Sequence, residues 1–217
     1  MKSELVLFDI ECQRDFFAAG GSCFDGRSPL IASRIYALFR WARQQRLSVV
    51  STVLRVRPYE RGPLAGVPHC VEGTDGERKL TRTLLTRRID FGLRNTTDLP
   101  PDLFERYQQV IFEKRHTDIL HHARAERLIS EMPPATFVIC GAGVAGGIAQ
   151  AAIGLKSRGF DIILACDAVH DLSSPLAEMA YRRMHAKGII FARTNEIISR
   201  RRYRQLAPFR RTFAPLG

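Results

Sequence analysis

Short apolar runs rich in β-branched residues alternate along the chain with longer stretches in which apolar positions recur at helical spacing. The runs predict six strands, at residues 5–10, 48–54, 110–112, 136–140, 160–166 and 189–192. The stretches between them predict helices at residues 29–46, 119–132, 144–158 and 174–187, with Asn195 capping a last one. The alternation therefore predicts an α/β three-layer sandwich, a six-stranded, mostly parallel sheet of Rossmann-like topology with helices on both faces.

Residues 55–97 interrupt this alternation with glycine, proline and charged residues that follow no sustained period. So long a segment without an element is unusual in a compact domain, so we expect it to carry function or short local structure. The chain of 217 residues is long enough for one large domain. We place that domain at residues 1–199 and a basic tail at residues 200–217.

The chain is strongly basic, with 33 Lys and Arg against 22 Asp and Glu and a net charge of +11. This balance favours anionic partners. The arginines are densest in the tail, at Arg200, Arg201, Arg202, Arg204, Arg210 and Arg211. We interpret the tail as a solvated helix end or a subunit contact. Nucleic acid is not an expected partner, because no helix-turn-helix pattern or aromatic-studded RNA motif accompanies these charges.

Five cysteines without a C-x-x-C spacing argue against a disulfide framework or a zinc knuckle and favour a reducing, cytoplasmic setting. Residues 135–155 contain no charged residue and are long enough to cross a bilayer. Five glycines divide this stretch, however, and a buried strand, a tight turn and a buried helix explain it. We therefore expect no membrane partner.

Candidate chemistry gathers where the predicted strands end. The first strand runs into Asp9, Glu11 and Asp15, and strand alternation predicts that Asp9 and Glu11 lie on the same side. Such carboxylates can serve as general bases or metal ligands. Lys114 follows the third strand, where an ammonium group can hold an anion or tune a proton transfer.

The fourth strand leads into a glycine-rich turn, Gly141–Gly147. Its G-x-G-x-x-G spacing between a strand and a helix is that of a dinucleotide fingerprint, and Asp167 is the candidate ribose-binding acid, at longer than the usual spacing. Glycines let a ligand approach the backbone, and a helix start offers N–H groups to an anion. The candidate anion-binding residues are Gly143, Val144, Gly146 and Gly147.

Taken in order, these segments resemble the isochorismatase-like cysteine hydrolases, which include nicotinamidases and N-carbamoylsarcosine amidases. The similarity rests on E-C-Q-R-D-F at residues 11–16, P-H-C-V-E-G-T-D-G at 68–76, Lys114 with Asp118, the glycine turn, and D-A-V at 167–169. It covers about residues 5–198. The resemblance implies a triad of Asp, Lys and Cys, in which the carboxylate accepts the thiol proton and the thiolate attacks a carbonyl.

The chain departs from that triad at two positions. Glu11 stands for the aspartate, and Gly147 stands for the cysteine, so the nucleophile position holds no side chain. None of the five cysteines is placed to replace it. The remaining pocket residues implied by the resemblance are Asp9, Gln13, Asp15, Phe16 and His69. Of the metal site of nicotinamidases only His69 is kept, since Leu54 and Val56 replace its other ligands, so we expect no metal and no cofactor.

These departures predict a family member that has lost thiol-dependent amide hydrolysis and keeps a pocket for a small molecule or anion. The resemblance also implies a homo-oligomer. One alternative is a hydrolase of a small metabolite that uses Glu11 and Lys114 as acid and base without a covalent intermediate. The other is a nucleotide-binding protein that uses the Gly141–Gly147 turn. Whether the protein is an enzyme stays open at this point.

Overall fold

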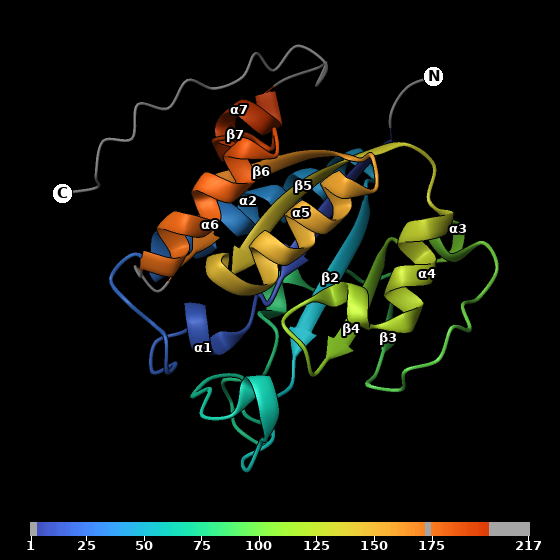
Figure 1. Ribbon diagram of the computed structural model, residues 1–217. Coiled ribbons are helices and arrows are strands. Elements are labelled where there is room, and N and C mark those ends of the chain that lie inside the picture. Colours follow the sequence, from blue (N-terminus) through green and yellow to red (C-terminus); the bar gives the residue numbers. More distant parts are fainter. Residues whose placement is uncertain (1–3, 172–174, 200–217) are drawn as a thin grey trace.

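The computed structural model, which describes residues 4–171 and 175–199, is built around one seven-stranded sheet (Figure 1). The strands are β1 (Glu4–Ile10), β2 (Ser48–Leu54), β3 (Arg88–Phe91), β4 (Gln109–Lys114), β5 (Ala135–Ala142), β6 (Asp161–His170) and β7 (Ile190–Ala192). They lie in the order β3-β4-β2-β1-β5-β6-β7, and every pairing is parallel. The predicted α/β sandwich is confirmed. Because all strands are parallel, their carboxyl ends lie along one edge of the sheet.

The prediction of six strands is wrong by one, because β3 lies inside the segment that showed no period. Its four residues pair only with β4, at the edge of the sheet, and Phe91 alone among them is buried. A strand this short, with Arg88 and Asp90 in it, carries too few apolar positions to show alternation in the sequence. The backbone of β4 supplies the pairing that defines it.

Helices cover both faces of the sheet (Figure 1). They are α1 (Arg14–Phe17), α2 (Ser28–Gln45), α3 (Leu103–Arg106), α4 (Ala123–Glu131), α5 (Ala149–Ser157), α6 (Pro175–Ala186) and α7 (Thr194–Ser199). Apolar side chains of α4, α5 and α6 form one core with Val6, Phe8 and Ile10 of β1. Those of α1, α2 and α7 form the other, to which Leu7 of β1 belongs. Because β1 is buried on both faces, residues 5–8 of the strand form a continuous apolar run.

Two predicted helices begin later than expected, each after a short turn. Residues 119–132 form the 3-10 turn η3 (Ile119–His121) and then α4, and the Asp118 carboxylate accepts the N–H of Leu120 at 2.9 Å. Residues 144–158 form the π-helical turn η4 (Val144–Ile148) and then α5. Gly146 in η4 has φ −112° and ψ −106°, which interrupts the helix. Both turns lie beside the candidate site.

The uncharged stretch at residues 135–155 is β5, η4 and α5, the strand, turn and helix that the sequence indicated. Within the described part of the chain, no helix combines the length and the apolar character that a bilayer crossing requires. The proposed basic tail at residues 200–217 lies outside the described residues.

Candidate functional site

Glu11 leaves the end of β1 in a left-handed backbone conformation, with φ 53°. This region is uncommon for a residue other than glycine and is held here by tertiary contacts, among them a 3.2 Å hydrogen bond from the Glu11 N–H to Thr52 Oγ1. The turn ends the alternation of the strand at Ile10. Asp9 and Glu11 therefore meet different partners, contrary to the expectation from strand alternation.

The carboxylate of Glu11 is paired with the ammonium of Lys114, with Oε1 and Nζ 2.5 Å apart. Each of the two residues is 3% exposed. Lys114 Nζ also donates to the carbonyl oxygens of His116 at 2.9 Å and Thr117 at 2.8 Å. An ammonium has three N–H donors, so this one is fully used, and it fastens the loop after β4 to Glu11.

Asp9 belongs to a separate buried network. Its carboxylate accepts hydrogen bonds from Ser51 Oγ and from Lys79 Nζ, and both charged side chains are almost fully buried. Gln109 continues the network by donating to Ser51 Oγ at 2.8 Å. Sequence reasoning missed Lys79, because nothing in its local pattern distinguishes it from a surface lysine. Asp9 thus ties β1 to β2 and to the long segment before β3.

The glycine turn brings the backbone of β5 against the end of β1. Gly141 has φ 126°, and a Cβ there would lie 1.8 Å from the Ile10 carbonyl oxygen, so only glycine fits. At Gly147 a Cβ would lie 2.9 Å from Glu11 Oε1 and 3.3 Å from the Thr117 carbonyl oxygen. A side chain at position 147 would therefore point at the Glu11–Lys114 pair. The Glu11 carboxylate already takes up part of the space that such a side chain would need.

The other turn residues are largely engaged within the protein. The N–H of Gly143 donates to the His170 carbonyl oxygen at 3.2 Å, and the N–H of Gly146 donates to the Gly143 carbonyl oxygen at 3.0 Å. Val144 is 1% exposed and packs in the core on the α5 side. Two of the N–H groups that the sequence assigned to an anion therefore have protein acceptors. Anion binding by this turn stays a prediction.

Gln13 and Asp15 fasten the segment that contains residues 68–76. The Gln13 amide exchanges hydrogen bonds with the backbone of Leu54, at 2.8 and 2.9 Å, and donates to the Glu77 carbonyl oxygen at 2.8 Å. The Asp15 carboxylate accepts the N–H of Cys70 at 2.6 Å. A Cβ at Gly76 would lie 2.0 Å from Asp15 Oδ1, which explains that glycine. Both side chains are buried and already bonded to the protein.

His69, whose pKa responds to the charges of Glu11 and Lys114, belongs to an aromatic group. The Phe16 ring lies 4.8 Å from the ring of His69 and 5.8 Å from that of His170, measured between centroids. Burial lowers the pKa of His69, although the charges of Glu11 and Asp15 oppose this effect. His69 Nδ1 is buried and has no hydrogen-bond partner within residues 4–171 and 175–199. The structure thus brings Phe16 and His69 to the same site as Glu11 and Lys114.

His170, at the end of β6, was not identified from the sequence, where a single histidine after an apolar run carries no signal. It is 1% exposed, and neither ring nitrogen has a hydrogen-bond partner among the described residues. Its Nε2 lies 3.6 Å from the Asp25 carboxylate, and burial lowers its pKa. Its ring packs against Phe16 and Phe17, while its carbonyl oxygen holds Gly143.

The residues around His69 do not fit a metal ion. Leu54 and Val56, at the positions where the resemblance implies ligands, are each 1% exposed and belong to the apolar core on the α2 side. Over the described ranges, no three His, Cys, Asp or Glu side chains group together as a metal would require.

The cysteines lie away from the glycine turn or are buried in apolar surroundings. Cys12, Cys70 and Cys140 are fully buried on the α2 side of the sheet. Burial raises the pKa of the Cys12 and Cys70 thiols, the reverse of what a nucleophile needs. Asp167, the candidate ribose-binding acid, instead accepts hydrogen bonds from Thr194 N at 2.7 Å and Thr194 Oγ1 at 2.8 Å. It therefore caps the start of α7.

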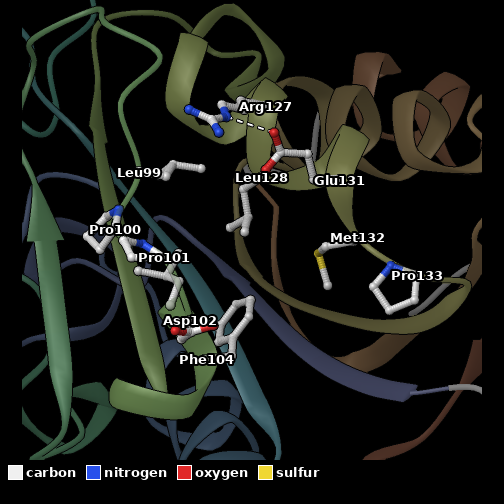
Figure 2. A pocket seen from close by; sticks show the side chains of 11 residues that line it. Leu99, Pro100, Pro101, Asp102, Phe104, Arg127, Leu128, Glu131, Met132 and Pro133 are labelled. Atoms are coloured by element: carbon white, nitrogen blue, oxygen red, sulfur yellow. Dashed lines mark hydrogen bonds and ion pairs between the residues drawn. The ribbon is translucent and has the colours of Figure 1, made fainter.

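A hollow of about 370 Å³ lies elsewhere, where α3 and the segment before it face α4 (Figure 2). Its walls include Leu99, Leu128 and Met132, and the ion pair between Arg127 and Glu131 stands at one side. The hollow adjoins the amino ends of β4 and β5, whereas Glu11, Lys114 and the glycine turn follow carboxyl ends. It is therefore separate from the candidate site.

Comparison with known proteins agrees with the family resemblance seen in the sequence. The model of the Isochorismatase domain family matches residues 5–196. A comparison with curated protein sequences found no match.

Similar solved structures include nicotinamidase from Bacillus subtilis, with 18% identity, TM-score 0.65 and coverage of 86% of this chain and 97% of that one. N-carbamoylsarcosine amidase from Thermoplasma acidophilum has 15% identity, TM-score 0.65 and coverage of 88% and 97%. Pyrazinamidase of Pyrococcus horikoshii, solved in complex with zinc, has 22% identity, TM-score 0.63 and coverage of 88% and 99%. At these identities the likeness shows the fold, and the family model, which spans most of the chain, shows that this protein belongs to the isochorismatase family.

Proposed function

We propose that this protein is an isochorismatase-family member without thiol-dependent amide hydrolysis, whose site binds a small anionic or amide ligand. One observation carries the proposal. Position 147, whose side chain would point at the Glu11–Lys114 pair, is glycine, with a Cβ position 2.9 Å from Glu11 Oε1. The base and the lysine are present, and the atom that would attack a carbonyl is missing.

Without a nucleophile, the pair can only move protons. General acid–base assistance contributes about 10²- to 10⁴-fold, far less than acyl transfer through a thioester requires. The full use of the Lys114 donors also favours a fixed ion pair over a proton shuttle. These contacts support a binding role over a catalytic one, with Phe16 and His69 as candidate neighbouring side chains.

Glu11 and Gly147 complement each other in size. Glutamate is one methylene longer than aspartate, and its carboxylate extends to where a Cβ at position 147 would begin. A large residue at one position and the smallest at the other fill the same volume, as packed interiors require. This complementarity supports the inference that the two departures are coupled and that the thiol has been lost.

The main alternative is a hydrolase that uses Glu11 and Lys114 on a bound water. The observation in its favour is the short, buried contact between the two groups beside an imidazole with a buried, unpartnered nitrogen. Nucleotide binding has less support, because Asp167 caps α7 and two N–H groups of the glycine turn already have protein acceptors.

Restoring the thiol tests the proposal. In Glu11→Asp with Gly147→Cys, the shorter carboxylate makes room for the new side chain. We expect a thiol with a depressed pKa, because it lies beside the Lys114 ammonium. Iodoacetamide should label it faster at neutral pH than the exposed thiol of Ala145→Cys, the matched control. Equal rates in the two variants would show that position 147 does not face the ion pair.

A second measurement separates the alternative. Wild-type protein should not hydrolyse nicotinamide or N-carbamoylsarcosine above the buffer rate. Amide or ether hydrolysis by the wild type that disappears in both Glu11→Gln and Lys114→Met, with the fold intact by circular dichroism, would favour the acid–base hydrolase. Thermal shift with benzoate and nicotinamide tests binding, since a ligand at 100 times its Kd stabilises by about 2.7 kcal/mol.

A further inference from the structure

A group of arginines gathers around one tyrosine on the outer face of α2, away from the ion pair of Glu11 and Lys114. Tyr36, Arg40 and Arg43 follow one another at positions i, i+4 and i+7, so they share a face of the helix. Arg40 and Arg43 are exposed, and Tyr36 is half-buried. The three span about 10 Å along the helix axis.

A fourth residue joins this face from a different element. Arg82 lies in η2 (Thr81–Thr83), which packs against α2, and its guanidinium carbon stands 4.3 Å from the centroid of the Tyr36 ring. Burial raises the pKa of the Tyr36 phenol, and the charges of Arg82 and Arg14 oppose that rise. The charges of Arg82 and Arg14 therefore both act on the Tyr36 side chain. We call Tyr36, Arg40, Arg43 and Arg82 the arginine–tyrosine surface.

The charge of this surface is not neutralised locally. Throughout residues 4–171 and 175–199, no carboxylate forms an ion pair with Arg40, Arg43 or Arg82. Arg14, whose charge also acts on Tyr36, differs from them, because it is paired with Asp75 at 2.6 Å. The helix dipole favours a cation in the last turn and so explains Arg43, but it explains neither Arg40 nor Arg82.

The chemistry of these groups fits one class of partner. Arginine binds phosphate oxygens with two parallel N–H groups, and it also stacks on flat rings. The Arg82 guanidinium lies over the face of the Tyr36 ring, and Arg82 is exposed, so its outer plane is the face on which a base can stack. Guanidinium groups beside such a stacking face neutralise the backbone of single-stranded nucleic acid. The net charge of +11 adds attraction at longer range. We propose that the arginine–tyrosine surface binds single-stranded RNA without sequence preference, a function independent of the one proposed for the ion-pair site. The proposal departs from the expectation that nucleic acid is not a partner, which was based on the arginine-rich tail and on sequence motifs.

Fluorescence anisotropy with a labelled oligouridylate tests this on the full chain. Reversal of all three charges, in Arg40→Glu, Arg43→Glu and Arg82→Glu, should weaken binding at least about tenfold and lower the slope of log K against log salt by about 2. The matched control is Arg183→Glu, Lys187→Glu and Arg193→Glu. It makes the same change in net charge at exposed positions on and after α6, and it should weaken binding less than about threefold.

The ring is tested separately from the charge. Tyr36→Ala removes the ring that supports the Arg82 guanidinium and should weaken binding about 5- to 100-fold, whereas Tyr36→Phe keeps that ring and should bind like the wild type. If the reversed-charge variant does not fold, the three Arg→Gln changes are measured instead, with weaker binding expected.

Three results would overturn the proposal. They are no RNA binding by the wild type, an equal loss in the charge-reversed variant and its control, and tighter binding of a labelled polyglutamate peptide to the same surface. The second would assign binding to charge elsewhere in the chain, and the third would assign the surface to an acidic protein.

Discussion

Two buried pairs of a carboxylate and a lysine lie at the end of β1, one through Asp9 in the strand and one through Glu11 just after it, and they differ in what surrounds them. Asp9 is paired with Lys79 and is also bonded to Ser51, which Gln109 holds in turn. Glu11 is paired with Lys114 and faces a turn of glycines. In the first pair, each carboxylate oxygen of Asp9 accepts a hydrogen bond from a protein side chain, one from Ser51 and one from Lys79. The second faces the glycine turn, and this is where we propose that a ligand binds.

The comparison teaches that burial and pairing alone do not mark a functional carboxylate. Both pairs are buried, and ionic pairs of this kind are weak evidence for stability or function by themselves. What separates them is the neighbouring backbone. The left-handed turn at Glu11 carries its side chain to the glycine turn, while Asp9 stays within the regular strand.

Removing one lysine of each pair gives the largest expected effect. Lys114→Met should lower the free energy of unfolding by about 3–5 kcal/mol, because it leaves the Glu11 carboxylate buried without its partner. Lys79→Met should cost less, since Asp9 keeps the Ser51 hydroxyl. Urea denaturation measures both.

Arg127→Met breaks the exposed pair with Glu131 and serves as the control, with an expected cost of about 0.3–0.5 kcal/mol. A larger cost for Lys79→Met than for Lys114→Met would reverse the comparison.

The second prediction sharpens the contrast in packing. Gly147→Cys alone should cost about 1–3 kcal/mol, because its Cβ meets Glu11 Oε1 at 2.9 Å and Ile10 Cγ2 at 3.1 Å. Adding Glu11→Asp should recover most of that loss. Thermal denaturation of the single and double variants gives the interaction energy between the two positions, and simple additivity would contradict the coupling.

The third prediction concerns the enclosed pair. Ser51→Ala removes the hydroxyl between Asp9 and Gln109 and should cost about 1–3 kcal/mol, because it leaves buried polar atoms unpaired. The iodoacetamide rate of Glu11→Asp with Gly147→Cys should not change when Ser51→Ala is added. A changed rate would mean that the two networks act as one.

The smallest expected effect is a pH dependence of folding stability that arises from His170, whose carbonyl oxygen accepts the N–H of Gly143. His170 has a lowered pKa, so below about pH 6.5 the unfolded chain takes up a proton first and stability falls as the pH drops. His170→Phe should remove that loss, at most about 1.4 kcal/mol per pH unit, and cost little at pH 8.

Denaturation at several pH values measures it. Asp25, Arg27 and Asp171 are the charges that act on His170. His69 and His122, whose pKa values burial also lowers, leave a residual slope. An unchanged pH profile of stability in His170→Phe would show that His170 does not cause the loss of stability at low pH.

The sequence by itself determined the parallel sheet and the positions of most of its elements. Continuous apolar runs can be satisfied only by burial on both faces, and helical spacing between them requires crossovers. The order of the motifs, among them residues 11–16, residues 68–76 and Lys114, also sufficed to indicate the family, which the family model confirms.

Only the tertiary structure decided how those side chains meet. Strand alternation placed Asp9 and Glu11 together, but one residue with φ 53° ended the alternation and sent them to different lysines. The partner of Asp9 is 70 residues away in a segment without a periodic pattern. Likewise, β3 exists because β4 offers an open edge. Local patterns report local periodicity, whereas the path of a long loop and a left-handed residue are set by contacts that form only when the chain is folded.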